Sequence, residues 1–219
     1  RYIENRLATL EKRGLTLPTP YCEVFRGETT DELIAMIRRL EASCDFLIID
    51  NPGRDDPFAR IAVEQADTLV TPMNDSFVDF DLIGQVDAET FKVKKLSFFA
   101  ELIWEARMKR SRMTIEQQRP EMDWIVVRNR TGHVEARNMA RLQKALTEMA
   151  KRVGFRVTQG LSERVIYREL FPSGLTLLDK GHLGELGTSH LVARQELRSL
   201  VKALALPDFE RAQSELELA

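Results

Sequence analysis

The chain of 219 residues lacks the features that mark several classes of protein. Its two cysteines, Cys22 and Cys44, are too few for a disulfide framework. No apolar run approaches the roughly 18 residues of a membrane-spanning helix, so we expect no membrane insertion. The three histidines are scattered, which fits neither a zinc site nor a Ser-His-Asp triad. Internal repeats and low-complexity segments are absent too. These absences favour a globular protein of a reducing cytosol, with Cys44 expected in the core.

Charge is nearly balanced over the whole chain but not along it. The net charge is −2, yet Asp123 to Arg168 holds ten Arg or Lys and four Asp or Glu. That stretch therefore carries +6 and the rest of the chain −8. The asymmetry predicts a surface for polyanions in the C-terminal half. A solvated surface whose acids lie elsewhere is the alternative.

Short apolar runs alternate with amphipathic helical patterns. This order predicts an α/β fold, a doubly wound and mostly parallel sheet between helices, in one domain over residues 1–219. On the helix at 96–118, we expect Trp104 and Met108 on one side and Arg107, Lys109 and Arg110 on the polar side. Residues 179–189 are predicted to be a surface loop. The predicted strands are Phe46–Asp50, Leu69–Thr71, Trp124–Val127 and Phe155–Val157. The predicted helices are Arg1–Leu7, Thr30–Ala42, Asp56–Ala66, Leu96–Gln118, Glu135–Val153, Arg164–Leu170 and His190–Leu204.

The run Phe46–Asp50 is the strongest indication of a ligand site. Ligands of open α/β sheets bind beyond the carboxyl ends of the strands. A carboxylate there is costly unless it is paired or near a metal, and the N–H of Gly53 could approach a phosphate. Asp50, Pro52 and Gly53 therefore indicate a Walker B strand with Mg²⁺ and a nucleotide. A helix cap or salt bridge is the alternative for Asp50, and Pro52-Gly53 alone indicates only a turn.

Two later segments also follow predicted strands. Asn129 could bind an adenine edge, because its amide both donates and accepts hydrogen bonds, or it could simply lie in a turn. The segment Thr71–Asp81 carries three carboxylates but no metal-ligating histidine. It is typical of a loop and a helix start capped by Asp75 or Ser76.

Basic residues recur at helical spacing in two places. Arg137 and Arg141 lie four apart on one helix, and Arg164 and Arg168 repeat the spacing on another. Such ridges could contact the phosphates of a nucleic acid without recognising its bases. Ion pairing with nearby glutamates is the alternative.

Four segments together resemble the MipZ family of ParA/MinD-type ATPases: Thr71–Asp81, Arg128–Arg130, Glu135–Asn138 and Arg164–Pro172. The resemblance covers nearly the whole chain and is weakest at residues 14–41 and 179–189. It implies a P-loop NTPase fold and a protein that positions the division plane. ATP would drive a homodimer that binds double-stranded DNA nonspecifically and inhibits FtsZ polymerisation, and ParB would recruit monomers. The expected location is cytoplasmic, on the nucleoid, with polar enrichment through ParB.

The resemblance also implies roles for single residues. Asp50 resembles the Walker B aspartate that holds Mg²⁺ through water, and Gly53 the switch II glycine. Asn129 resembles the asparagine that contacts adenine. The other residues expected near ATP are Pro52, Phe171 and Pro172, and those expected to face DNA are Arg137, Arg141, Arg164 and Arg168.

This sequence departs from the family pattern in a few places. Asn51 and Arg54 replace the usual Thr and Gly, and Ser162 stands where an arginine would strengthen the DNA surface. The family places the P-loop, with its strand and helix, before Arg1. We therefore expect ATP hydrolysis by the full-length protein and none by the printed chain alone. A ParA partition ATPase and a non-catalytic DNA-binding or adaptor protein remain the alternatives.

Overall fold

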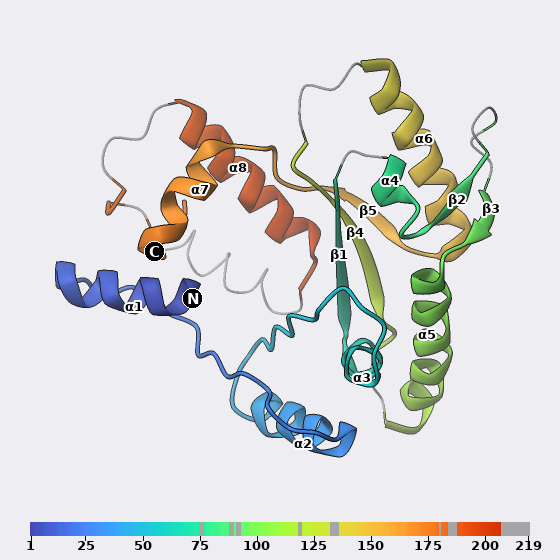
Figure 1. Ribbon diagram of the computed structural model, residues 1–219, viewed down its shortest axis with the longest axis horizontal. Coiled ribbons are helices and arrows are strands. Elements are labelled where there is room, and N and C mark those ends of the chain that lie inside the picture. The colour runs from blue at the N-terminus through green and yellow to red at the C-terminus, as the bar shows by residue number, and fades with distance from the viewer. Residues whose placement is uncertain are drawn as a thin grey trace. The chain divides into compact units, whose positions relative to one another are not determined.

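The computed structural model describes residues 1–74, 77–87, 90, 93–117, 120–131, 136–179, 181–183 and 188–206 (Figure 1). Helices and strands alternate from α3 to α7, apart from the consecutive strands β2 and β3. The helices are α1 (Tyr2–Arg13), α2 (Thr30–Glu41), α3 (Pro57–Gln65), α4 (Phe77–Phe80), α5 (Phe98–Gln117), α6 (Ala136–Val153), α7 (Val165–Leu170) and α8 (Thr188–Ala203), and a 3₁₀ turn spans Phe171–Ser173. The strands are β1 (Thr68–Asn74), β2 (Gly84–Val86), β3 (Val93–Leu96), β4 (Asp123–Asn129) and β5 (Arg156–Gln159).

The main sheet has the strand order β1-β4-β5 and is mostly parallel, flanked by helices. The predicted α/β class is thus confirmed. The central strand β4 buries four consecutive residues, Trp124 to Val127, as expected for a strand covered on both faces. The edge strand β1 runs on to Asn74, beyond its predicted end at Thr71. Proline has no backbone N–H, so Pro72 cannot donate a hydrogen bond to a neighbouring strand. An edge strand tolerates this, because some of its N–H groups have no neighbouring strand to pair with.

The chain forms two compact units. The first unit comprises Arg1–Glu23, Arg128–Val134 and Thr158–Ala219, and the second comprises Val24–Val127 and Glu135–Val157. The single domain over residues 1–219 stays a prediction.

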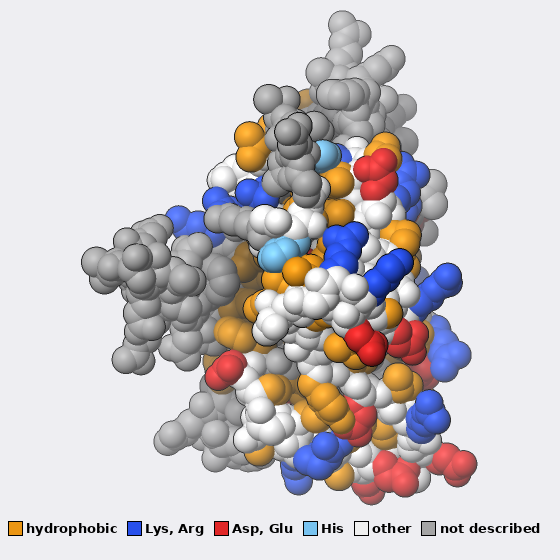
Figure 2. All heavy atoms as spheres, turned by 90° about the vertical axis from the view of Figure 1, so that its left-hand side faces the viewer, with side chains coloured by type: hydrophobic (Ala, Val, Ile, Leu, Met, Phe, Trp, Pro, Cys, Tyr) orange, Lys and Arg blue, Asp and Glu red, His pale blue; other side chains and the backbone are white. Residues whose placement is uncertain are grey.

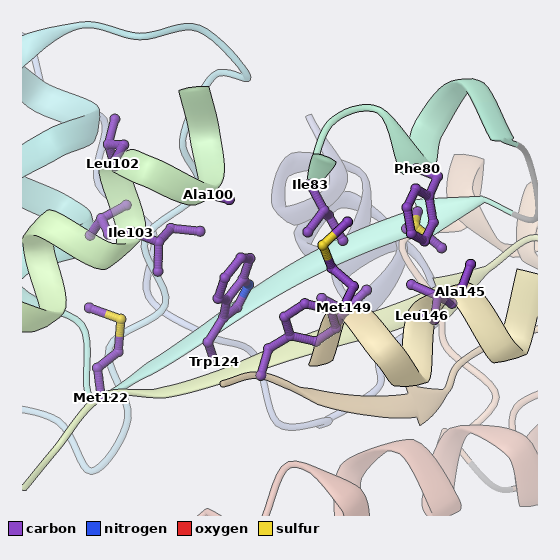
Figure 3. Packing of buried hydrophobic residues seen from close by; sticks show 14 of the residues in the cluster. Phe80, Ile83, Ala100, Leu102, Ile103, Met122, Trp124, Ala145, Leu146 and Met149 are labelled. Carbon is purple, nitrogen blue, oxygen red and sulfur yellow. The ribbon is translucent and has the colours of Figure 1, made fainter. Parts of the chain in front are cut away.

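The hydrophobic core of the second unit gathers around Trp124 (Figure 3). The Trp124 ring meets the ring of Phe155 with 5.0 Å between centroids, and its Nε1 donates to Thr71 Oγ1 at 3.0 Å. The indole is therefore buried without leaving its donor unpaired. Further side chains of the core come from α5 and α6, among them Ile103, Leu146 and Met149.

The first unit is held by a buried ion pair that sequence reasoning missed. Arg6 of α1 donates to both carboxylate oxygens of Asp179 at 2.8 Å, and the two side chains are 5% and 7% exposed. Arg6 also donates to the carbonyl oxygens of Pro18 and Gly174. We predicted a surface loop that begins at Asp179, and for Asp179 this prediction is wrong because its side chain is buried.

Local signals set several helix ends. Thr29 and Glu32 form a reciprocal capping box at the start of α2. Asp56 caps α3 by accepting from the Ala59 N–H at 2.8 Å, directly before Pro57. Gly154 follows α6 with φ +81°, a conformation that favours glycine.

The predicted strand Phe46–Asp50 is wrong. The segment forms no strand, and Phe46 and Ile48 are 48% and 89% exposed. An apolar run becomes a strand only where a neighbour satisfies its N–H and C=O groups, and no described strand pairs with it. Cys44, expected in the core, is exposed as well, because the segment it precedes is not packed.

Two further differences lie between residues 81 and 112. The antiparallel hairpin β2–β3 was not predicted, and it takes Leu96 away from the predicted helix. The prediction that Arg110 lies on the polar side of α5 is also wrong. Trp104 and Met108 are 56% and 49% exposed, whereas Arg110 is 1% exposed and reaches Asp67 and the carbonyl oxygens of residues 65 and 120.

Candidate functional site

A hollow of about 280 Å³ lies in the first unit, where β4 ends. Asn129 and Arg130 reach it from the end of β4, and Tyr167 and Arg168 from α7. The backbone of Thr131 bridges to the 161–163 segment, with N–H···O distances of 3.3 and 3.2 Å. This bridge fixes one wall of the hollow beside the end of the strand. The remaining lining residues are Leu161, Ser162, Glu163 and Arg164.

Glu196 of α8 holds the Ser162–Arg164 segment in place. Its two carboxylate oxygens accept from Arg164 Nε at 3.1 Å and Nη2 at 2.6 Å. The same carboxylate accepts from Ser162 Oγ at 2.8 Å and from the Ser162 N–H at 3.3 Å. Arg164 and Glu196 are only about one-fifth exposed, so water screens the pair less than it would a surface pair.

Arg164 and Glu196 shift each other's pKa. Hydrogen bonding with Arg164 is the main reason that the pKa of Glu196 lies below its ordinary value. The Arg164 pKa is raised chiefly by the same hydrogen bonds to Glu196. Both side chains therefore stay charged near neutral pH. The charge of Arg164 is neutralised within the unit.

The other cations of the hollow are more accessible. Arg130 is exposed, and its φ of +51° is uncommon for a residue with a Cβ. Among the described residues, Arg168 makes only a long contact of 3.5 Å, with Glu163. The Tyr167 hydroxyl donates to the Ala193 carbonyl oxygen at 3.4 Å, and burial raises its pKa. Two accessible guanidinium groups and the Asn129 amide suit an anion or the polar edge of a base.

The structure groups some predicted site residues and not others. Asn129, Arg164 and Arg168 line the hollow. The side chains of Arg137 and Arg141, on α6, lie outside the described residues. Asp75 and Ser76, the predicted helix caps, lie outside them too.

Phe171 and Pro172 form the 3₁₀ turn after α7 and are exposed. The Phe171 ring lies 6.2 Å from the ring of Tyr2, and its carbonyl oxygen accepts from Asn5 Nδ2 at 3.2 Å. In the structure this turn contacts α1 and is not part of the hollow.

Asp50, Pro52 and Gly53 belong to an exposed segment of the second unit. A Cβ built on Gly53 would meet nothing within 4 Å. Within the described residues, no three His, Cys, Asp or Glu side chains gather as metal ligands. The Mg²⁺ role expected of Asp50 stays a prediction.

The sequence model of the family ATPase MipZ matches residues 1–208. The chain belongs to the MipZ ATPase family. A search of curated proteins found no match. The MipZ family consists of ParA/MinD-type ATPases that act in positioning the division site, so nucleotide binding is expected of this chain. None of the described helices is long and apolar enough to span a membrane.

Sequence reasoning missed the residue that organises the hollow of this MipZ-family chain. Glu196 lies 32 and 34 residues from the two side chains it binds, Arg164 and Ser162. The alternative reading of the basic ridges, ion pairing with glutamates, holds for Arg164, which pairs with Glu196, and for Arg168, which lies 3.5 Å from Glu163. The charge pattern of α7 indicated the pairing, but the distant partner on α8 had no local signal.

On the surface, the two charge signs lie close together. Figure 2 shows Lys and Arg side chains beside Asp and Glu side chains on one face of the molecule. On this face, the described residues form no broad area of one sign. In the +6 stretch of the sequence, Arg164 is neutralised by an acid from elsewhere in the chain, Glu196.

Proposed function

We propose that this protein is a ParA/MinD-type ATPase that positions the division plane by regulating FtsZ assembly. ATP binding drives its homodimerisation, the dimer binds double-stranded DNA without sequence preference, and ParB recruits the monomer. Membership of the MipZ family over residues 1–208 carries the proposal. The hollow around Asn129 supports it, because an amide and two accessible guanidinium groups suit a nucleotide.

Within this proposal, the residues act by holding and orienting ATP. Asn129 binds the adenine edge, and Asp50 holds Mg²⁺ through its water shell. Gly53 leaves room for the γ-phosphate beside its N–H, since no Cβ and no neighbour lies there. Pro52, Phe171 and Pro172 border the nucleotide. Bound Mg²⁺ supplies neutralisation of phosphate charge.

The four arginines contribute unequally to DNA binding. Arg137 and Arg141 contribute the larger share of the phosphate contacts. Arg164 contributes less, because Glu196 already compensates its charge in a half-buried pair, whereas the pair of Arg168 with Glu163 is longer and exposed. The proposed surface binds phosphates only, so it confers no sequence preference.

The decisive experiment removes the Asp50 carboxylate from the protein as its gene encodes it. Asp50→Ala should reduce ATP hydrolysis to background while the circular dichroism melt stays unchanged, because the side chain is exposed. Asp45→Ala is the matched control, since Asp45 is another exposed carboxylate of the same segment. Hydrolysis of Asp50→Ala at the wild-type rate would contradict the proposal and favour a non-catalytic adaptor.

A further inference from the structure

Two guanidinium groups of the hollow at the end of β4 are open to an acidic ligand. Arg130 is exposed and, within the described part of the chain, makes no hydrogen bond or ion pair. The Arg168 side chain is 69% exposed, and its contact of 3.5 Å with Glu163 is long and screened by water. Arg164 differs from both, because Glu196 compensates its charge in a half-buried pair. The hollow therefore offers two accessible cations.

Apolar side chains lie beside these cations. Leu161 and Tyr167 line the same hollow. Val165 is 60% exposed and lies three residues before Arg168 on α7, so the two side chains share one side of the helix. A ligand that suits this wall carries acidic and apolar side chains in alternation, rather than acids alone or apolar groups alone.

The sequence after α8 contains a segment of this chemistry. Residues 207–219 lie outside the described residues and hold four acids and one base. Within them, Glu215-Leu216-Glu217-Leu218 alternates acid and leucine. Residues two apart in an extended chain point to the same side and lie about 7 Å apart, so the two carboxylates can face two separate guanidinium groups. The family match ends at residue 208, so it does not extend to this segment.

The segment is attached within reach of the hollow. Glu196 contacts the wall of the hollow from the middle of α8, and the helix continues to Ala203. At 1.5 Å per residue, this continuation carries the chain about 10 Å farther. The stretch from Ala203 to Glu215 spans up to about 40 Å when extended, which is enough to return to the hollow. A tether of this length gives a local concentration on the order of millimolar, so even a weak contact is populated.

We propose that the segment Glu215–Leu218 docks in the hollow of its own chain as an autoinhibitory contact. Its two carboxylates pair with Arg130 and Arg168, and its leucines cover the apolar side chains beside them. Docked there, the segment competes with other anions for the two guanidinium groups. Ion pairs between exposed groups are weak, so an anion that binds tightly displaces the segment. The contact itself does not depend on the proposed ATPase function.

Disulfide trapping in the protein as its gene encodes it tests the proposal. The test pair is Val165→Cys with Leu216→Cys, in a background where Cys22, Cys44 and any other cysteine are replaced by serine. The matched control pair is Leu191→Cys with Leu216→Cys, because Leu191 is similarly exposed in the same unit but does not line the hollow. Under mild oxidation, the test pair should form an intramolecular disulfide roughly tenfold faster or more than the control pair, since docking raises the local concentration of the two thiols.

Charge reversals show whether the ion pairs cause the trapping. Arg130→Glu with Arg168→Glu should slow the test pair to the rate of the control pair, and so should Glu215→Arg with Glu217→Arg. All four reversals together should restore the fast rate, because opposite charges then face each other again. Thermal melts of all variants verify folding.

Inorganic pyrophosphate tests the competition between the segment and other anions. It should slow trapping of the test pair more than sodium chloride of equal ionic strength does, because it binds the same guanidinium groups. Equal slowing by the two salts would overturn the autoinhibitory role. Equal rates for the two cysteine pairs, or reversals that neither slow nor restore trapping, would overturn the docking itself. Disulfides found only between chains, as dimers on a non-reducing gel, would overturn docking within one chain.

Discussion

At the scale of single residues, the pair of Arg6 and Asp179 dominates the first unit. Removing one partner of a buried ion pair leaves the other charge uncompensated, at a cost of about 3 kcal/mol. Asp179→Asn should therefore lower the free energy of unfolding by about that amount in urea denaturation. Glu11→Gln, which removes an exposed carboxylate of α1, should leave it nearly unchanged. Equal effects of the two changes would show that the pair adds nothing specific.

The same pair gives stability a pH dependence. The hydrogen bonds from Arg6 are the main cause of the lowered pKa of Asp179. Its folded pKa therefore lies below the unfolded value of about 3.9. The stabilisation is complete above that unfolded value and is lost as the pH falls through the folded pKa. Unfolding titrations should show a constant difference between wild type and Asp179→Asn at neutral and mildly acidic pH, and a shrinking one below about pH 4.

Glu196 offers a test of the DNA proposal at one residue. Glu196→Gln keeps one accepting oxygen, replaces the other by an NH2 group that cannot accept, and removes the charge that compensates Arg164. Duplex DNA binding should become tighter, and its salt dependence steeper by up to about one unit, as for one added phosphate contact. Glu169→Gln, an exposed carboxylate on α7, is the matched control for net charge alone. A slope that changes equally in both variants would place Arg164 outside the DNA surface.

At the scale of elements, the end of α6 depends on Gly154. Its φ is +81°, and a Cβ there would lie 3.0 Å from Arg107 Nη1. Gly154→Ala should lower the free energy of unfolding by more than the roughly 1–2 kcal/mol of left-handed strain, because Arg107 must shift. Gly14→Ala is the control for strain alone, since Gly14 has φ +61° and nothing within 4 Å. Urea denaturation measures the free energy of unfolding of both variants. A larger loss for Gly14→Ala than for Gly154→Ala would contradict this account.

Two apolar runs of similar composition show what makes a strand. Phe46–Asp50 and Trp124–Val127 are both short and rich in large apolar residues, yet only the second is a strand. The second lies in β4, with β1 and β5 on its two sides. The first has no described strand beside it to satisfy its backbone. Composition predicts the capacity to form a strand, and a pairing partner decides the outcome.

At the scale of the whole molecule, DNA affinity should come from the sum of separate basic contacts. Arg137→Ala with Arg141→Ala should flatten the salt dependence of duplex binding by about two units per subunit if each side chain touches one phosphate. ATP-driven dimerisation should persist, because neither residue is assigned to the nucleotide. Ser162→Arg should tighten binding by adding a cation. An unchanged slope in the double variant, or a strong sequence preference, would contradict the proposal.

Much of the fold follows from the sequence alone. Capping at Thr29 and Asp56, glycine at 154 and the apolar periodicity of α2 and α6 predicted helices to within a few residues of their observed ends. These signals act between neighbours in the chain, so they can be read locally. The alternation of helices and strands likewise predicted the mostly parallel sheet, because crossover connections join parallel strands.

Only the tertiary structure decided which side chains meet. The pairs Arg6–Asp179 and Arg164–Glu196 join residues 173 and 32 positions apart, and no local pattern names such partners. The exposure of Trp104 and the burial of Arg110 were decided in the same way, by the neighbours that α5 packs against. A sequence determines which faces of an element are able to pack. Whether each face is covered, and which distant charges end up paired, depends on the packing of the whole chain.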